Sequence, residues 1–422
     1  MPAALASHVD RRALAVARAR VDEELVILLE GPRSVGKSTM LRDLAASLGA
    51  EVLDLDDLAT RDAVTRDPAL FMAGPSPVCV DEYQKAPLVL DAIKAELNRS
   101  GRPGRFVLAG STRFDALPEA AQSLTGRLHR LTVRPLSQCE LDGGGHSPVA
   151  QLFEDPAGAV GSAPSTTPRE EYVERVVAGG FPMALARRTP AARARWFDDY
   201  VRLTLERDVR ELSKVRQAAA LPRLLERLAG QTGQVLTTAS AAADVGLDER
   251  TADGYLRLLE AVFLVHRLPA WARTTTSRAR QRPKLHVVDS GVAARLLRLG
   301  PDKLAARTPA ALQQFGHLLE TFVVQELLTQ ASWTDDLTGA GHWRTKDGDE
   351  VDLVLERDDG AVIAFEVKAG SRVPGDELKG LRKLRDAVGE PFLAGIALYL
   401  GQRSYTYEDR LHVLPVDRLW RG

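Results

Sequence analysis

The sequence predicts an α/β protein, in which a domain with a parallel sheet is followed by a helical middle segment and a second α/β domain. Apolar runs of strand length alternate with helical segments over residues 1–140, and a glycine-rich loop follows the first run. Such alternation predicts a parallel sheet with helices on both faces. At 422 residues the chain is too long for one hydrophobic core, so we expect several domains.

The composition is that of an ordinary globular protein, with 45% hydrophobic and 27% charged residues. We expect it in the cytoplasm and away from membranes, because the first twenty residues lack the apolar segment of a signal peptide and no window approaches 18 apolar residues. Cys79 and Cys139 lack metal-ligand spacing and are expected in the core. The net charge of −1 argues against a surface that binds nucleic acid everywhere.

Strands and helices are expected in regular order in the first domain. The predicted strands are 25–29, 51–55, 78–80, 106–109 and 128–133, and the predicted helices include 10–20, 37–48 and 87–99. The rest of the chain is expected to form a linker or surface insertion, a helical lid segment, a winged helix-turn-helix and a carboxy-terminal α/β domain, at residues 141–168, 169–215, 216–275 and 276–422 respectively.

The loop after the first predicted strand matches the phosphate-binding pattern G-x-x-x-x-G-K-[ST]. Gly31 and Gly36 let the backbone turn so that successive N–H groups face phosphate oxygens. Lys37 would reach the β- and γ-phosphates, and Ser38 would offer its hydroxyl to Mg²⁺ at the positive end of a helix. We therefore predict that ATP and Mg²⁺ are bound here by Gly31, Pro32, Arg33, Ser34, Val35, Gly36, Lys37, Ser38 and Thr39.

Two acids, Asp81 and Glu82, end an apolar strand about 40 residues after this loop. Asp81 fits the role of holding Mg²⁺. Glu82 is placed to polarise the attacking water as a general base. The additional strand predicted at 51–55, between the loop and the two acids, indicates the sheet order of the additional-strand P-loop ATPases.

Polar residues near the next two strands are candidates for contacts with the γ-phosphate. Ser111 or Thr112, after the strand that ends at Ala109, would act as a sensor, or would only solvate the strand end. Arg127 precedes the following strand and would reach the ATP of a neighbouring subunit as an arginine finger in a homo-oligomer. A surface ion pair at Arg127 is the alternative.

Motifs throughout the chain resemble one family. They are GPRSVGKST, VDEYQKAP, LAGSTRF, LTGRLHRLTVRPLSQCEL, GGFP, RLLEAVFLVHRLPAW, KLHVVDSGVAARLL, EVDLVLE and AFEVKAG. In this order they are similar to the AAA-type ATPases that carry a carboxy-terminal DUF4143 domain. The resemblance covers nearly the whole chain and implies an ATPase core, a winged helix and a nuclease-like fold of the PD-(D/E)xK type. It implies no particular substrate.

The middle segment predicts a winged helix-turn-helix, because three short helices precede an apolar strand at 262–268. On the third helix Arg250 and Arg257 would lie on the outer face together with Asp253. There the two arginines would contact DNA in the major groove. The alternative is a helical module that packs on the ATPase or on a partner.

A basic stretch without acids follows, and its basic residues are Arg273, Arg278, Arg280, Arg282 and Lys284. Such a stretch predicts either a solvated loop or an arm that contacts phosphates.

The carboxy-terminal domain carries two acids and a lysine on adjacent strands. A three-residue turn with Gly360 in the left-handed conformation would place Asp352 opposite Glu366. By the strand period of two, Asp352 shares a face with Val354, and Glu366 shares one with Lys368.

The resemblance implies roles for these residues, as in nucleases of the D…(D/E)-x-K type. Asp352 and Glu366 would bind Mg²⁺, and Lys368 would stabilise the phosphate or orient the water. Glu320, in an apolar helix, would complete the metal site, with Glu326 as a weaker candidate. The alternative is a set of paired charges that only stabilises the hairpin.

Two functions of different classes are compatible with these residues. In the first, ATP hydrolysis drives a rearrangement that presents bound DNA to a nuclease-like domain. In the second, slow ATP turnover gates the binding of a partner, and the carboxy-terminal domain is catalytically silent. The set Glu320, Asp352, Glu366 and Lys368 favours the first.

Overall fold

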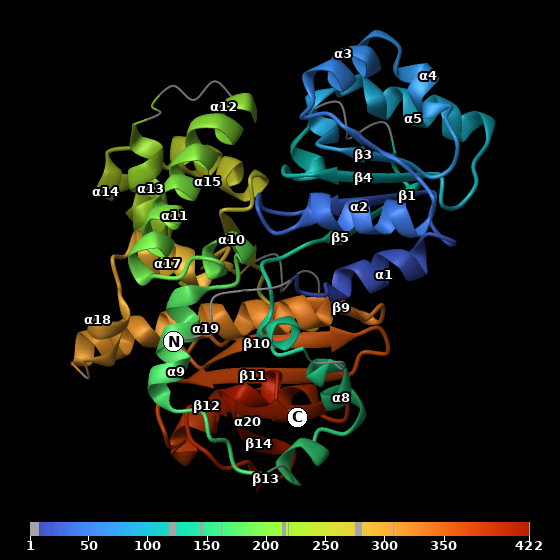
Figure 1. Ribbon diagram of the computed structural model, residues 1–422. Helices are drawn as coiled ribbons and strands as arrows, with labels where there is room; N and C mark the ends of the chain where they lie inside the picture. Colours follow the sequence, from blue (N-terminus) through green and yellow to red (C-terminus); the bar gives the residue numbers. More distant parts are fainter. Residues whose placement is uncertain are drawn as a thin grey trace.

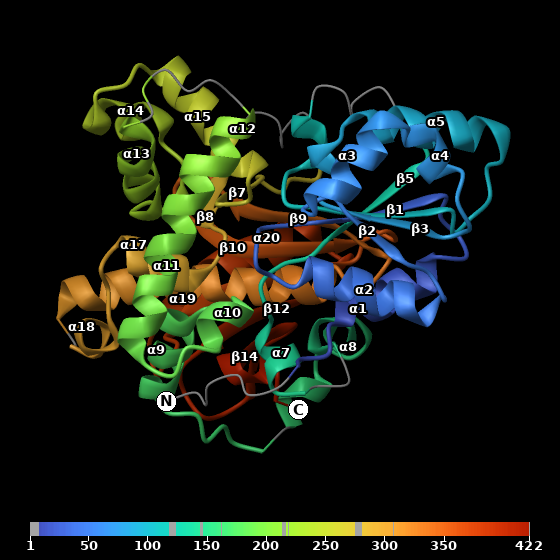
Figure 2. The ribbon, with the colours of Figure 1, turned by 45° about the horizontal axis from the view of Figure 1, so that its top comes forward.

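The computed structural model describes residues 8–117, 124–143, 147–161, 163–212, 217, 219–274, 281–306 and 308–421. These residues form an ATPase part, a middle part and a carboxy-terminal part, drawn in blue to teal, green to light orange and orange to red in Figure 1. Figures 1 and 2 show the ATPase part and the helices of the middle part side by side. No helix within the described ranges has both the length and the apolar character that a membrane crossing requires.

The ATPase part contains every strand predicted for it, in one parallel sheet of order β2-β3-β4-β1-β5. The strands are β1 (Val26–Glu30), β2 (Val52–Asp54), β3 (Val78–Asp81), β4 (Phe106–Gly110) and β5 (Leu128–Thr132). β4 lies between β1 and β3, as expected of an additional-strand P-loop domain. β1, β3 and β4 are buried at every position because helices cover both faces of the sheet.

The helices of the ATPase part divide between the two faces. On one face, α1 (Arg12–Arg20) and α2 (Lys37–Ser47) share a hydrophobic cluster with the sheet. On the other face lie α3 (Leu58–Arg66), α4 (Pro68–Met72) and α5 (Leu88–Arg99). Cys79 and Cys139 are buried, as predicted.

The segment 141–168 is more than a linker. It contains α8 (Pro148–Glu154), which buries three apolar side chains. Ser165 and Thr167 are buried too, and their hydroxyls donate to Asp417 over 2.6 and 2.7 Å. The prediction of a surface insertion is wrong here, because a helix of only seven residues leaves too short a periodic pattern to be seen among Gly, Ser, Pro and Ala.

The middle part is mainly helical, and the GGFP sequence separates two of its helices as predicted. Its elements are α9 (Arg169–Ala178), α10 (Pro182–Leu185), α11 (Pro190–Leu203), the π-helical turn η4 (Thr204–Asp208), α12 (Val209–Leu212), α13 (Ala220–Ala229), α14 (Thr238–Val245), α15 (Glu249–Ala261), α17 (Ser290–Leu296) and α18 (Pro301–Ala305).

A small antiparallel sheet completes the middle part. Its strands are β6 (Gln234–Val235), β7 (Val265–Leu268) and β8 (Lys284–Val287), in the order β6-β8-β7. The predicted domain boundary at residue 276 therefore lies too early, because β8 pairs with strands that precede this boundary.

The carboxy-terminal part is a six-stranded mixed sheet between two helices, α19 (Pro309–Ala331) and α20 (Lys379–Val388). Figure 1 shows α19 between this sheet and α17, and it contacts both. The strands lie in the order β13-β14-β12-β11-β10-β9 and are β9 (Leu337–Arg344), β10 (Glu350–Arg357), β11 (Val362–Lys368), β12 (Phe392–Tyr399), β13 (Tyr405–Glu408) and β14 (Leu411–Pro415).

Candidate functional site

The phosphate loop connects β1 to α2, and its residues form one tight turn. Ser34 and Gly36 adopt left-handed backbone conformations, with φ of 63° and 98°. A Cβ atom on Gly31 would lie 2.1 Å from the carbonyl oxygen of Val133. Gly31 is therefore required by close packing against the chain that follows β5, a reason that the motif alone does not give.

Lys37 begins α2 and is buried within the loop. Its Nζ donates to the carbonyl oxygens of Gly31 and Pro32 over 2.9 and 2.7 Å. Burial lowers the pKa of Lys37 to about 8. Phosphate oxygens held by the loop would favour the charged form of this lysine.

The predicted ligands of Mg²⁺ lie next to each other. The Ser38 side chain hydrogen-bonds to the carboxylate of Asp81, the last residue of β3. Burial raises the pKa of Asp81, and the bond from Ser38 opposes this effect. A hydroxyl and a carboxylate beside a phosphate loop match the preference of Mg²⁺ for oxygen, so these residues fit the ion.

Glu82 follows β3 in the left-handed conformation, with φ 52° and ψ 42°. Such a backbone is costly for a residue other than glycine and is often found at functional sites. The Glu82 carboxylate accepts hydrogen bonds from Gln84 Nε2 over 2.5 Å and from Ser111 Oγ over 3.3 Å. Ser111, predicted as a phosphate sensor, thus contacts the predicted base. Gln84 was not predicted, because no feature of the sequence marks it as a partner of Glu82.

Arg127 lies at the opposite edge of the sheet. It precedes Leu128, which pairs with Val26 at the start of β1, whereas the phosphate loop follows the end of β1. Five residues of strand separate the two edges by roughly 16 Å. Arg127 donates to Asn98 Oδ1 over 2.7 Å. At this distance Arg127 does not contact the ATP of its own chain. Its contact with the ATP of a neighbouring subunit stays a prediction.

Two hydrogen bonds attach the phosphate loop to distant parts of the chain. Arg33 Nε donates to Asp208 Oδ2 over 2.6 Å, and Asp208 ends the π-helical turn η4. Arg11 Nη1 donates to the carbonyl oxygen of Val35 over 2.6 Å. π-Helical turns occur frequently at functional sites, and this one brings a carboxylate to the loop.

The segment after β4 also touches the middle part. The amide of Arg113 donates over 2.9 Å to the carbonyl oxygen of Ala261, the last residue of α15. The Arg113 guanidinium lies 5.4 Å from the centroid of the Phe263 ring. Arg113, which directly follows the predicted sensors Ser111 and Thr112, therefore touches the end of the predicted DNA-contacting helix.

The carboxy-terminal hairpin follows the predicted register. β10 and β11 are antiparallel with Leu353 opposite Phe365, and continuing this register places Asp352 opposite Glu366. Gly360 in the connecting turn is left-handed, with φ 84°.

The predicted alternation of side chains is wrong at Asp352. A β-bulge lies between Val351 and Val354, and both of these valines pack beneath α20. The Asp352 carboxylate instead accepts the amide of Val367 over 2.8 Å. Asp352 and Val354 do not share a face, because the extra residue of a bulge shifts the period of the strand by one.

Lys284, at the start of β8, occupies the centre of the predicted metal site. It is 1% exposed, and its Nζ lies 2.8 Å from Glu320 Oε1, 2.7 Å from Asp352 Oδ1 and 3.6 Å from Glu350 Oε1. Burial lowers the pKa of Lys284, but Asp352 and Glu320 outweigh this and hold it well above its ordinary value. The prediction of a solvated loop or a phosphate-contacting arm is wrong for Lys284. Arg278 and Arg280 lie outside the described residues.

The residues present do not fit the predicted metal site formed by Glu320, Asp352 and Glu366. The Lys284 ammonium lies between the first two carboxylates, and Lys368 Nζ donates to Glu366 Oε1 over 3.0 Å. Burial, and then the charge of Asp352, raises the pKa of Glu366 to about 8. Among the described residues, no three His, Cys, Asp or Glu side chains are arranged to hold a metal ion.

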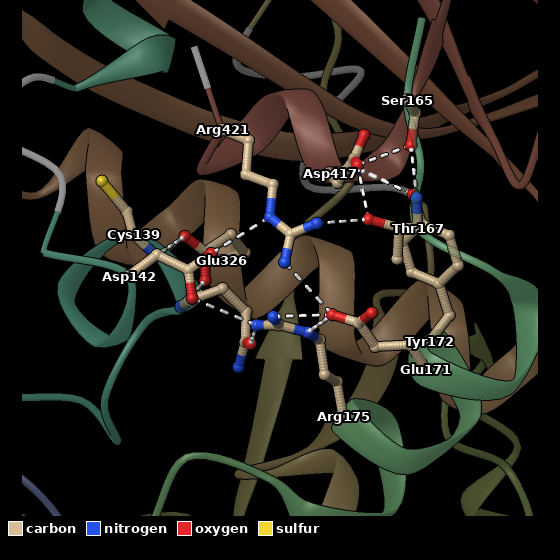
Figure 3. A network of polar contacts seen from close by, with 11 residues as sticks. Cys139, Asp142, Ser165, Thr167, Glu171, Tyr172, Arg175, Glu326, Asp417 and Arg421 are labelled. Atoms are coloured by element: carbon tan, nitrogen blue, oxygen red, sulfur yellow. Dashed lines mark hydrogen bonds and ion pairs between the residues drawn. The ribbon is translucent and has the colours of Figure 1, made fainter. Parts of the chain in front are cut away.

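Glu326, the weaker metal candidate, lies outside this cluster. Figure 3 shows it at the beginning of α7 (Gln138–Leu141), where it accepts two backbone amides over 2.6 and 3.2 Å. In the same network Arg175 and Arg421 both donate to Glu171. The bonds of Glu326 join α19 to α7, and the bond of Arg421 joins the carboxy-terminal end of the chain to α9, so Glu326 has a structural role.

Two predicted DNA contacts lie on the outer side of α15. Arg250 and Arg257 are exposed, whereas Leu256 and Leu259 are buried on the opposite side. Arg257 forms an ion pair with Asp253 one turn away. Of the two arginines, Arg257 is therefore partly neutralised.

Comparison with known proteins matches three families along the chain. An AAA domain family matches residues 23–141, a domain of unknown function (DUF8612) matches 169–303, and a domain of unknown function (DUF4143) matches 315–419. The chain therefore carries an AAA domain and, after it, a DUF4143 domain. Its amino-terminal domain is an ATP-binding domain of the AAA type. The DUF8612 match includes β8, in agreement with the sheet pairing.

Relatives of this chain include an uncharacterized protein of Mycobacterium tuberculosis and one of Mycobacterium bovis. Each is 28% identical over 416 residues, which cover 97% of this chain and 85% of the relative. The Walker-type ATPase PABY2304 of Pyrococcus abyssi is 13% identical with a TM-score of 0.45, over 68% of this chain and 96% of that one. The RuvB Holliday junction branch migration motor of Thermotoga maritima is 15% identical with a TM-score of 0.30, over 62% of this chain and 90% of that one.

Proposed function

We propose that this protein hydrolyses Mg-ATP at its phosphate loop and transmits the nucleotide state to its middle part. The observation that carries the proposal is the joint position of Lys37, Ser38, Asp81 and Glu82 at one edge of the parallel sheet. Lys37 would bind the β- and γ-phosphates, and Ser38 and Asp81 would hold Mg²⁺, which would neutralise charge on these phosphates.

Glu82 would take a proton from the attacking water. Gln84 and Ser111 both donate to Oε2 of its carboxylate and so fix its direction. A base must lie within hydrogen-bond reach of the proton that it removes, so its orientation matters as much as its basicity.

Two hydrogen bonds would transmit the nucleotide state. The bond from Arg33 to Asp208 connects the phosphate loop to η4, and the bond from Arg113 to Ala261 connects the segment after the sensor residues to α15. A nucleotide that displaces the loop or the sensor would therefore act directly on the middle part.

Phosphate release from ATP tests the proposal. We expect turnover in the presence of magnesium by the wild type and none by Lys37→Ala, because the variant lacks the cation that binds the γ-phosphate. Lys346→Ala, which removes an exposed lysine, should keep wild-type turnover. Equal turnover by all three proteins would disprove hydrolysis at this loop.

For the carboxy-terminal part we infer a recognition module without metal-dependent cleavage. The ion pairs of Lys284 with Glu320 and Asp352 support this inference over the nuclease alternative. We expect no cleavage of DNA or RNA with Mg²⁺ or Mn²⁺. Cleavage by the wild type that is abolished in Asp352→Ala would show that the nuclease alternative is right.

DNA is a candidate partner, and the exposed positions of Arg250 and Arg257 on α15 favour it. The order helix, strand, helix, helix, strand, strand from α13 to β8 is typical of a winged helix and supports the same idea. We expect the double variant Arg250→Ala/Arg257→Ala to bind duplex DNA more weakly. Its salt slope should fall by about 1 for each phosphate group that the variant no longer neutralises.

Binding of duplex DNA at several salt concentrations checks this prediction. Arg99→Ala is the matched control, because Arg99 is exposed on α5, far along the chain from α15. A salt slope that is the same in the double variant and in the wild type would remove α15 as the DNA-binding element.

A further inference from the structure

A cavity of about 340 Å³ lies where the ATPase part, the middle part and α19 meet. Arg113, Arg130 and Arg134 line it from the ends of β4 and β5, His266 and His286 from the small sheet, and Gln325 from α19. We propose that this cavity binds the phosphate group of a small molecule at a site separate from the phosphate loop. Of residues 31–38, Pro32 alone lines it.

Two guanidinium groups in this cavity form no ion pair with any carboxylate in the described part of the chain. The Nε atoms of Arg113 and Arg134 are buried and have no hydrogen-bond partner. Neither arginine has a carboxylate within 4.0 Å among the residues that the structure describes, whereas Arg130 pairs with Asp115 over 3.3 Å. Cations with buried nitrogen atoms and no counter-charge are costly, and an anion between them would remove that cost.

The acids that line the cavity do not fill this role. Asp115 is exposed and is the partner of Arg130. Glu30 accepts the amide of Phe114 over 3.1 Å; burial raises its pKa, and the charges of Arg130 and Arg113 offset this only in part. The cavity therefore keeps an excess of positive charge.

His286 adds a third nitrogen atom without a partner. Its Nε2 atom is buried and unpaired, while its Nδ1 lies 3.2 Å from Thr321 Oγ1. Thr321 Oγ1 lies 2.8 Å from Thr232 Oγ1, which accepts the amide of Val287. The arrangement that uses both hydroxyl protons in these bonds makes Nδ1 an acceptor, and it leaves a proton on Nε2 that has no acceptor.

The chemistry of these groups favours phosphate. Two guanidinium groups and an imidazole N–H supply donors from several directions, which suits an anion with several acceptor oxygens. The volume is that of a small-molecule pocket, and Phe263, Val324 and Leu328 give it an apolar wall for the rest of a ligand. The site lies at the carboxyl edge of a parallel sheet, where α/β proteins commonly bind ligands.

A ligand here would connect parts that already touch. Arg113 donates its amide to Ala261 and stacks on Phe263 of the middle part, while Arg134 follows β5 of the ATPase part. A phosphate bound by both guanidinium groups would hold the end of α15 against the sensor segment. The ligand would thus regulate the coupling between the two parts.

Binding of inorganic phosphate to the full-length Lys37→Ala variant tests the site, because the phosphate loop is disabled in this background. We expect saturable binding by calorimetry at constant ionic strength. Adding Arg113→Gln or Arg134→Gln should weaken it by about ten- to hundred-fold each, which is the effect of removing one charge-assisted hydrogen bond. Adding Arg99→Gln, on the exposed surface of α5, should leave it unchanged.

A folding control and a second ligand complete this test. Without phosphate, Arg134→Met should unfold at the same temperature as its parent or higher, because it removes an unpaired buried charge; this confirms that it folds. Adenosine monophosphate that binds more tightly than phosphate would identify a nucleotide as the ligand, and equal binding would identify free phosphate. Absence of phosphate binding in Lys37→Ala, or equal binding with and without the arginine substitutions, would overturn the proposal.

Discussion

Replacing Lys284 with methionine should lower the free energy of unfolding by about 3–5 kcal/mol. The side chain is 1% exposed and lies within 2.8 Å of both Glu320 and Asp352. Methionine has a similar volume but no charge, so two carboxylates would stay buried without a counter-charge. Urea denaturation of the purified protein measures the decrease, which should exceed the effect of most single substitutions.

The cause of this decrease can be separated from a simple packing defect. Glu320→Gln and Asp352→Asn, added to Lys284→Met, should restore most of the stability, because no buried charge is then left without a partner. Lys303→Met on α18 is the surface control and should change stability by less than about 0.5 kcal/mol. If Lys284→Met alone were as stable as the wild type, the ion pairs of Lys284 would not stabilise the fold.

Replacing Glu82 with glutamine should lower kcat for ATP hydrolysis by about 10²- to 10⁴-fold, the usual contribution of a general base. Glutamine keeps the shape of the side chain and can still bond to Gln84 and Ser111, but it cannot take a proton from water. ATP binding should persist, because Lys37 and Asp81 are untouched. Single-turnover phosphate release measures the rate, and retention of labelled ATP measures binding.

Glu51→Gln is the control for this substitution, since Glu51 is exposed just before β2. It should keep wild-type kcat. Wild-type turnover in Glu82→Gln would show that another group activates the water.

The fold of the ATPase part could be predicted because each of its features is encoded in a short stretch of sequence. The central strands β1, β3 and β4 are apolar runs. The phosphate loop follows β1 directly, and Asp81 and Glu82 lie at the end of β3, as their chemistry requires. The turn at Gly360 was predicted for the same reason, since one left-handed residue fixes the register of the hairpin.

The carboxy-terminal cluster could be predicted only in part. Asp352, Glu320 and Glu366 are buried together as expected, but the bulge that redirects Asp352 depends on pairing with β9. Lys284 reaches the cluster from a strand of the middle part, 68 residues before Asp352. In the sequence it ends a basic stretch, and such charge patterns do not tell a solvated lysine from one that a distant strand buries.

The contacts between the ATPase part and the middle part could not be predicted from the sequence for the same reason. Arg33 and Asp208 are 175 residues apart, so the motif around Arg33 carries no sign of its partner. Arg113 and Arg134 follow predicted strands, but the cavity that they line exists only once β7, β8 and α19 are in place.

The central claim is that the backbone amides of residues 31–38 and the ammonium of Lys37 form a site for a nucleoside triphosphate. Equilibrium retention of labelled ATP in the presence of magnesium tests it most directly, with the wild type, Lys37→Ala and Lys346→Ala compared at one protein concentration. We predict that the wild type and Lys346→Ala retain ATP and that Lys37→Ala does not. Equal retention by Lys37→Ala, or none by the wild type, would contradict the claim.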